Sequence, residues 1–271
     1  MAHHCQCHKS ALSLQNLPFT AKNRDFLRIQ AILAEKTWIG FDLDDTLHEF
    51  RQASKAATTE VLGWISRKWD APLPTLKEEY LRILANKTAN AFTDGRTAAE
   101  YRRERFGTLL DHSFLPLHDA YLSYIVRQYD ATLMKSLQLK PGALDLLKTI
   151  KSMGKKIVVI TEGPQDAQEQ TIEALGLNEY IDFLATSNDL RVSKTMGLFP
   201  KVLQHLEISS DEMAYIGDSD ERDMKPALAN AIFCVRFAEM EDTDLASTPP
   251  SISSLTDLQQ VLQHGNADQS T

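Results

Sequence analysis

The order of apolar and polar positions predicts alternating helices and strands in two parts of the chain, with helices alone between them. Apolar residues recur at helical spacing in 22–34, and the apolar run 37–43 ends abruptly in acids, which is typical of a buried strand. After Pro141 and Gly142, helices are expected at 143–153, 165–176, 199–206 and 223–230, and strands at 156–161, 181–185, 213–217 and 232–237. This alternation predicts βαβ units and a parallel sheet with helices on both faces.

The stretch between the first two predicted strands is charged, and its apolar residues recur at the i, i+3, i+4 spacing of packed helices. We expect helices there at about 51–69, 75–90, 97–110 and 117–136. The fold class is therefore α/β: a parallel, three-layer Rossmann-like sheet with an inserted all-helical domain. The expected division is a flexible leader at 1–20, a core of 21–48 and 139–240, a helical insert at 49–138, and a C-terminal helix with a loose tail at 241–271.

Composition narrows the class of partner. A net charge of −8 argues against binding to a nucleic acid polymer, which needs a clustered basic excess. No run approaches the roughly 18 apolar residues of a membrane span. The cysteines Cys5, Cys7 and Cys234 form no disulfide framework, so we expect a reducing compartment, the cytoplasm. The N-terminal cluster of His3, His4, Cys5, Cys7 and His8 has no second ligand pair, so we expect adventitious metal binding or none.

Residues that could take part in catalysis or binding lie where the predicted strands end. They are Asp42 and Asp44 at the end of the first strand, Thr161, Glu162 and Gly163 at the end of the second, Lys194 further along, and Asp218 and Asp223 after the strand 213–217. Ligands of open α/β sheets bind beyond the carboxyl ends of the strands. Asp42 and Asp44 also share a face, because residues two apart in a strand point the same way. We therefore expect one site at one edge of one sheet.

Three carboxylates in one small space repel each other strongly, and a hard divalent cation removes that penalty. Mg²⁺ takes oxygen ligands and favours one or two carboxylates together with a substrate phosphate. A bound Mg²⁺ would also explain how a chain of charge −8 receives a phosphate ester. Lys194 would add a second positive charge, and Thr161 would donate its hydroxyl to a phosphoryl oxygen.

Each of these residues also has a simpler structural interpretation. Asp218 fits a turn, Thr161 can cap the helix that follows it, and a single lysine such as Lys194 is commonly a solvated surface residue. Taken singly, these roles are the more common ones. Their order along the chain, each at a strand end, favours a catalytic site that acts on a small phosphorylated molecule.

In context, these residues resemble the motifs of the haloacid dehalogenase-like (HAD) superfamily. WIGFDLDDTL is similar to its first motif, hhhhDxDxT, and VVITEG resembles the second, a strand that ends in Thr or Ser. Lys194 in SKTMGLFPKVL fits the third motif, and AYIGDSDERDM resembles the fourth, GDxxxxD. The resemblance covers roughly residues 35–240, and the helical insert stands where the family has its C1 cap. It implies a Mg²⁺-dependent phosphatase.

Carried over by position, the resemblance implies that Asp42 is the nucleophile and forms an aspartyl-phosphate. Asp44 would be the general acid and base. Mg²⁺ would be held by Asp42, the backbone carbonyl of Asp44, and Asp218, while Asp223 would orient Lys194 or a metal-bound water. The implied phosphate-binding residues are Thr161, Glu162, Gly163 and Lys194.

The sequence departs from the family pattern at Glu162, where many relatives have Asn, and so adds a negative charge. Within the insert, NAFTDGRTAAEYRRERF resembles caps of phosphatases acting on nucleoside monophosphates or sugar phosphates. We expect His48 and Arg51 to lie close to the leaving group. Arg96 follows a glycine turn and is a further candidate for substrate binding, the alternative being an exposed residue at a helix start.

Other functions share part of this pattern. A phosphoglucomutase-type phosphotransferase has the same catalytic groups, and a phosphonate hydrolase would need a lysine from the cap. A haloacid dehalogenase would need neither metal nor the second acid, Asp44. A phospho-acceptor receiver domain, or a catalytically idle HAD-like scaffold, would be a signalling or binding module instead of an enzyme. The sequence does not indicate the substrate or the oligomeric state.

Overall fold

The computed structural model describes residues 21–87 and 92–263, so the expected leader at 1–20, with its His/Cys cluster, lies outside the described residues. The strands are β1 (Trp38–Phe41), β2 (Lys156–Thr161), β3 (Phe183–Thr186), β4 (Met213–Gly217), β5 (Phe233–Phe237) and β6 (Ser251–Ile252). They form one sheet in the order β3-β2-β1-β4-β5-β6, and every pairing is parallel. Because β1 lies between β2 and β4, the segments that follow these three strands meet at one edge.

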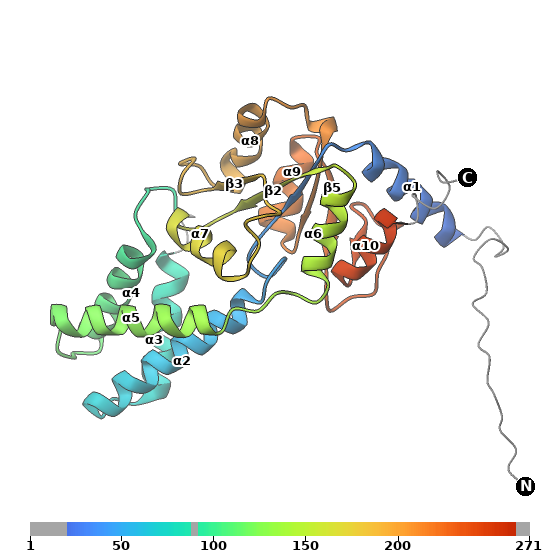
Figure 1. The fold of residues 1–271 in the computed structure, drawn as a ribbon. Coiled ribbons are helices and arrows are strands. Elements are labelled where there is room, and N and C mark those ends of the chain that lie inside the picture. Colours follow the sequence, from blue (N-terminus) through green and yellow to red (C-terminus); the bar gives the residue numbers. More distant parts are fainter. Residues whose placement is uncertain (1–20, 88–91, 264–271) are drawn as a thin grey trace, which may run out of the picture.

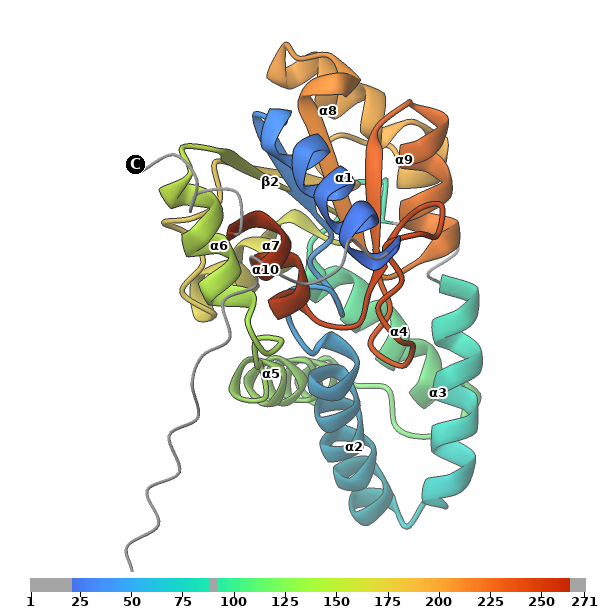
Figure 2. The same cartoon turned by 90° about the vertical axis from the view of Figure 1, so that its right-hand side faces the viewer.

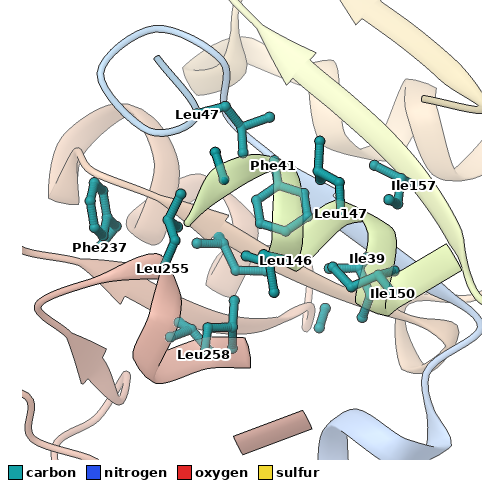
Figure 3. Close-up of a cluster of buried hydrophobic side chains, with 14 of the residues drawn as sticks. Ile39, Phe41, Leu47, Leu146, Leu147, Ile150, Ile157, Phe237, Leu255 and Leu258 are labelled. Atoms are coloured by element: carbon teal, nitrogen blue, oxygen red, sulfur yellow. The ribbon is translucent and has the colours of Figure 1, made fainter. Parts of the chain in front are cut away.

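Successive side chains of each strand point to opposite faces of the sheet and enter two separate apolar clusters. On one face, Ile39 and Phe41 of β1 pack against helices α1 (Ala21–Glu35), α6 (Ala143–Ser152) and α10 (Leu255–Gln263), as Figure 3 shows for α6 and α10. On the other face, Val158 and Tyr215 pack against α8 (Leu198–Leu206) and α9 (Lys225–Ala229). The three-layer α/β fold expected from the sequence is confirmed.

The residues between β1 and β2 form four helices with an apolar cluster of their own. The helices are α2 (Phe50–Trp69), α3 (Leu73–Lys87), α4 (Ala98–His112) and α5 (Asp119–Lys135). Their cluster includes Val61, Ile65, Phe106, Leu109 and Ile125, all buried. Figures 1 and 2 show the four helices as a group to one side of the sheet. We call residues 50–135 the cap; the expected domain boundaries at 48/49 and 138/139 stay a prediction.

The two segments that connect cap and core are hydrogen-bonded to each other. The backbone N–H of Glu49 donates to the carbonyl of Gln138 over 2.9 Å, and that of Lys140 donates to the carbonyl of Leu47 over 2.9 Å. The Lys140 ammonium group also donates to the Glu49 carboxylate over 2.9 Å. The connection therefore behaves as a short paired ribbon and not as two independent linkers.

A second set of contacts joins cap and core through Asp166, in α7 (Gln165–Ala174), and Asn188. The Asp166 carboxylate accepts from the backbone N–H of Ala98 over 3.0 Å, at the first turn of α4. The Asn188 side-chain amide donates to the carbonyls of Phe92 (3.0 Å) and Arg96 (3.1 Å). These contacts hold the start of α4 against the core.

Differences from the expected elements are small. Strand β6 was not predicted, because a two-residue strand has no periodicity to recognise. The expected helix 223–230 begins instead with a π-helical turn at Asp220–Met224, followed by α9. The last residues of the expected helix 75–90 and the tail from 264 lie outside the described residues. Within the part of the chain that the structure describes, no helix combines the length and apolar character that crossing a membrane requires.

Candidate active site

The turn after β1 carries the first pair of acids. The Asp42 backbone N–H continues the ladder to β4 by donating to the carbonyl of Ile216 over 2.9 Å. Asp45 then takes a left-handed conformation, with φ of 62°. Non-glycine residues adopt this region uncommonly, although Asp tolerates it better than most. β1 ends at Phe41, and Asp42 and Asp44 in the segment that follows both line a cavity beyond the sheet.

A buried lysine lies between two buried carboxylates at the centre of this edge. The Lys194 ammonium nitrogen is 2.5 Å from Asp42 Oδ1 and 2.6 Å from Asp223 Oδ1, and the three side chains are 3%, 8% and 2% exposed. Burial lowers the pKa of Lys194, but Asp223 and Asp42 more than offset this, so its pKa lies above the usual value. Burial raises the pKa of Asp42 well above its usual value, although Lys194 opposes the rise. Lys194 is therefore a fixed positive charge beside Asp42.

Asp223 is held in place from several sides. It accepts from the Tyr215 hydroxyl over 2.8 Å and from the Ser219 backbone N–H over 3.0 Å. Two glycines make room for this arrangement: a Cβ at Gly217 would lie 2.6 Å from Asp223 Cγ, and one at Gly40 would lie 2.9 Å from the Tyr215 ring. Neither position accepts a side chain without movement of the network.

Asp42, Asp218 and Asp223 each place one carboxylate oxygen within 4.8 Å of the others. Burial raises the pKa of Asp218 above its usual value, and the charge of Asp223 adds to this. Crowded carboxylates with raised pKa values are what a hard divalent cation stabilises, since it takes oxygen ligands and removes their repulsion. The donor set therefore fits Mg²⁺. The side chain of Asp44 is not part of this group, and the expected contribution of its backbone carbonyl stays a prediction.

At the end of β2, one residue has a side chain without a hydrogen-bond partner, and the two residues that follow are hydrogen-bonded to other parts of the core. The Thr161 side chain is buried, and its hydroxyl has no hydrogen-bond partner among the described residues. Glu162, expected at the phosphate, instead accepts from the Lys194 backbone N–H over 2.9 Å. The Gly163 backbone N–H donates to the Ser187 hydroxyl over 3.2 Å. Glu162 thus orients the segment that carries Lys194, because a carboxylate accepts the backbone bond that this turn needs.

The candidates for substrate contact differ in where they lie. Arg51 lines the cavity and forms an ion pair with Asp218 over 3.2 Å. His48 was expected near the leaving group, but its side chain is fully buried and its Nε2 lies 2.9 Å from Asp44 Oδ1. His48 also forms a backbone bridge with Leu139, within the paired ribbon.

Arg96 was a candidate for reaching into the active site from its glycine turn, the alternative being an exposed residue at a helix start. Its guanidinium instead forms ion pairs with Asp94 (2.8 Å) and Glu104 (2.6 Å) and lies over the Tyr101 ring. Arg96 is not among the described residues that line the cavity. Two nearby acids satisfy its charge on the outside of α4, so the structure does not support the expected contact.

The cavity has a volume of about 340 Å³ and lies between the sheet edge and the cap. Its cap side includes Tyr101, Arg102 and Arg105 of α4, none of which the sequence analysis singled out. The available signal was their spacing: residues three and four apart share a helix face, and this face continues into buried Phe106 and Leu109. A basic group beside an apolar stripe indicates that these side chains point inward from the cap.

The model of one protein family, described as haloacid dehalogenase-like hydrolase, matches residues 39–237. The chain belongs to this family. The match begins within β1 and ends with β5, so it includes the cap and every residue of the sheet edge described above.

Two similar proteins are phosphatases by name. Glyceraldehyde 3-phosphate phosphatase from Methanocaldococcus jannaschii is 25% identical over 84% of this chain and 97% of its own length. Ribulose-1,5-bisphosphate 5-phosphatase from Halopiger xanaduensis is 27% identical over 77% of this chain and 87% of its own. Among solved structures, YfnB from Bacillus subtilis, described as a HAD-hydrolase bound to magnesium, superposes with a TM-score of 0.65 at 22% identity. That superposition covers 84% of this chain and 99% of YfnB and shows a shared fold.

Proposed function

We propose that this chain hydrolyses phosphate monoesters of small molecules, with Asp42 as the nucleophile and Asp44 as the general acid and base. The observation that carries the proposal is the Asp42 carboxylate, buried at a cavity and 2.5 Å from a Lys194 ammonium group. Lys194 opposes protonation of Asp42 and places positive charge where a phosphoryl group would bind. The two phosphatases at 25% and 27% identity support the same reaction class.

In the first step, a carboxylate oxygen of Asp42 forms a bond to phosphorus as the bond from phosphorus to the ester oxygen breaks. Asp44 donates its proton to the departing oxygen, which leaves as an alcohol. In the second step, Asp44 takes a proton from water, the water oxygen bonds to phosphorus, and the bond to Asp42 breaks. Inorganic phosphate is released and both acids return to their starting states.

The contacts of Asp44 and Thr161 are consistent with these roles. His48 Nε2 lies 2.9 Å from Asp44 Oδ1 and fixes the position of that carboxylate in the turn. The buried Thr161 hydroxyl has no partner among the described residues, which leaves its proton available to a phosphoryl oxygen. Lys194 would hold a second phosphoryl oxygen, while Asp223 and Glu162 keep Lys194 in position.

Asp42, Asp218 and the backbone carbonyl of Asp44 would hold Mg²⁺. When bound, Mg²⁺ supplies positive charge that offsets the charge developing on the phosphoryl oxygens. Asp223 lies within the same carboxylate group but is engaged by Lys194, so we assign it a supporting role. A magnesium-bound solved structure of the same fold agrees with this choice of metal.

For the substrate, we propose a nucleoside monophosphate or a sugar phosphate. A cavity of about 340 Å³ suits a small molecule and is far too small for a polymer. The two phosphatases described above act, by name, on a three-carbon sugar phosphate and a sugar bisphosphate, which favours the sugar phosphates. We also propose that cap and core, divided at 48/49 and 138/139, are separate domains and that the protein acts in the cytoplasm.

The test is release of inorganic phosphate from p-nitrophenyl phosphate by the full chain, with Mg²⁺ or with EDTA. Turnover is expected with Mg²⁺, loss in EDTA, and recovery on adding Mg²⁺. Asp42→Asn should lower kcat by about 10⁴-fold or more, because an amide is not a competent nucleophile. Exposed Asp145→Asn is the control and should be unaffected. Activity of Asp42→Asn close to wild type would exclude Asp42 as the nucleophile, and transfer of phosphate without net release would indicate a mutase.

A further inference from the structure

We infer that the cap side of the cavity binds a second anionic group of the substrate, and that Arg105 is the residue that selects for it. The inference rests on the proposed function, because it takes the phosphoryl group of the substrate to lie at Asp42. Of the substrates proposed above, this favours a sugar phosphate that carries a carboxylate or a second phosphate at its far end over a nucleoside monophosphate, whose far end is a neutral base.

Charge is distributed unevenly around the cavity. The core contributes Asp42, Asp44, Asp45, Glu162 and Asp223 to the lining, together with Lys194 and Arg222. The cap contributes Arg51, Arg102 and Arg105, and no acid among the described residues. A ligand between the two sides therefore meets fixed positive charge at its cap end, in a partly enclosed site where charges act more strongly than in water.

The three cap arginines are not equivalent. Arg51 forms ion pairs with Asp45 and Asp218, and buried Arg102 forms one with Asp130. Arg105 also lines the cavity, but within the described residues no carboxylate forms an ion pair with it. Its Nε is buried and has no hydrogen-bond partner in that part of the chain. A buried N–H without an acceptor is costly, and an anion in the cavity would satisfy it.

Two other buried polar atoms of the cavity lining also lack partners among the described residues: the Thr161 hydroxyl and an amide oxygen of Gln168. Buried polar groups in folded proteins are nearly always hydrogen-bonded, so unpaired atoms around one space indicate a polar ligand. Thr161 belongs to the phosphoryl end. Gln168 offers an acceptor for a hydroxyl, and Arg105 offers a donor for an anion, so the ligand has both groups beyond its phosphate ester.

The test compares three esters with the same carbon chain: 3-hydroxypropyl phosphate, 3-(phosphonooxy)propanoate and propane-1,3-diyl bisphosphate. A second set of three esters with five-carbon chains tests a longer distance between the phosphate ester and the tail group. Wild-type kcat/KM should be about 10- to 100-fold higher for an anionic tail than for the neutral tail, the range of a hydrogen bond between charged groups. The two anionic esters show whether the tail is a carboxylate or a second phosphate. Hydrolysis of the neutral ester reports the proposed function independently.

Arg105→Met and Arg105→Gln should both abolish this preference, while Arg103→Met should keep it. Arg103 is the matched control, because it lies in the same helix, pairs with Asp119 and does not line the cavity. Thermal unfolding of each variant identifies any loss of fold. Equal wild-type kcat/KM for neutral and anionic tails in both sets of esters would overturn the inference while leaving the phosphatase proposal intact. A preference that survives in both folded Arg105 variants would also overturn it.

Discussion

The two sides of the cavity are built in opposite ways. On the core side, acids lie at or shortly after strand ends, and the central one, Asp223, is held by the core residues Tyr215, Ser219 and Lys194. On the cap side, arginines and aromatic rings project from helices that pack in a separate apolar cluster. The core side depends on Gly40 and Gly217, where any added side chain would force the Tyr215–Asp223 network to move. Under the proposed function, chemistry and substrate choice would therefore depend on structures with different tolerance to substitution.

This contrast predicts two kinds of mutational effect. A core substitution should lower activity toward every ester, or by an amount that depends on the leaving group, because in the proposed function the reacting atoms lie at the core. A cap substitution should change the ratio between esters. The predictions below run from the largest expected effect to the smallest.

Asp44→Asn should lower kcat for alkyl phosphates by about 10²- to 10⁴-fold, the usual contribution of general acid–base catalysis. The loss should be smaller for p-nitrophenyl phosphate, because p-nitrophenol leaves with little protonation. Steady-state kinetics on both esters measure the difference. An equal loss on the two esters would contradict the acid role, and the same comparison with Arg105→Met should show no dependence on the leaving group.

Lys194→Met should lower kcat by about 10²- to 10³-fold, the range found when one preorganised donor is removed. It should also destabilise the protein by about 3–5 kcal/mol, because Asp42 and Asp223 are left buried without their counterion. Urea unfolding measures the free energy. Lys201→Met is the control, because Lys201 is exposed and its ammonium group donates to the backbone carbonyl of Leu190 and not to a buried carboxylate. A stability change no larger than that of the control would show that the buried network matters little to folding.

Tyr215→Phe removes the hydroxyl that donates to Asp223 and leaves the apolar packing in place. The expected loss is about 1.5–3 kcal/mol of unfolding free energy, typical of a hydrogen bond to a charged group, with a few-fold drop in kcat for all esters alike. The cap residue Tyr124 packs its ring against Trp64 at a tilt, and Tyr124→Phe should change neither quantity. A drop in kcat of Tyr215→Phe for one ester alone would contradict the assignment of substrate preference to the cap.

Asp166→Ala should have the smallest effect, about 0.5–2 kcal/mol, the cost of losing an acceptor at a helix N-terminus. Because Asp166 ties the start of α4 to the core, KM for all esters should rise together by a few-fold while kcat changes little. Steady-state kinetics and thermal unfolding measure the two effects. A change in the preference between neutral and anionic tails would show that cap position and cap chemistry are not separable.

The sheet and its acids could be predicted because their signals are local in sequence. Apolar runs of strand length ending in Asp42, Thr161 and Gly217-Asp218 indicate both the strand and its functional end. The cap residues have no comparable local signal. Helical spacing predicts which side chains of a cap helix face inward, but it does not predict which part of the protein they face. Reasoning from the glycine turn singled out Arg96, which pairs with acids outside the cavity. It passed over Arg105, because only the three-dimensional structure reveals that its Nε has no hydrogen-bond partner among the described residues.

Asp166 and Asn188 hold the cap to the core through backbone groups alone: the N–H of Ala98 and the carbonyls of Phe92 and Arg96. Backbone groups remain in place whichever side chains the cap presents. The cavity-lining side chains of α4 can therefore be replaced without losing these backbone contacts between cap and core. Single substitutions there would change which ester the cavity accepts, while the hydrogen bonds that Asp166 and Asn188 form with the cap backbone stay in place.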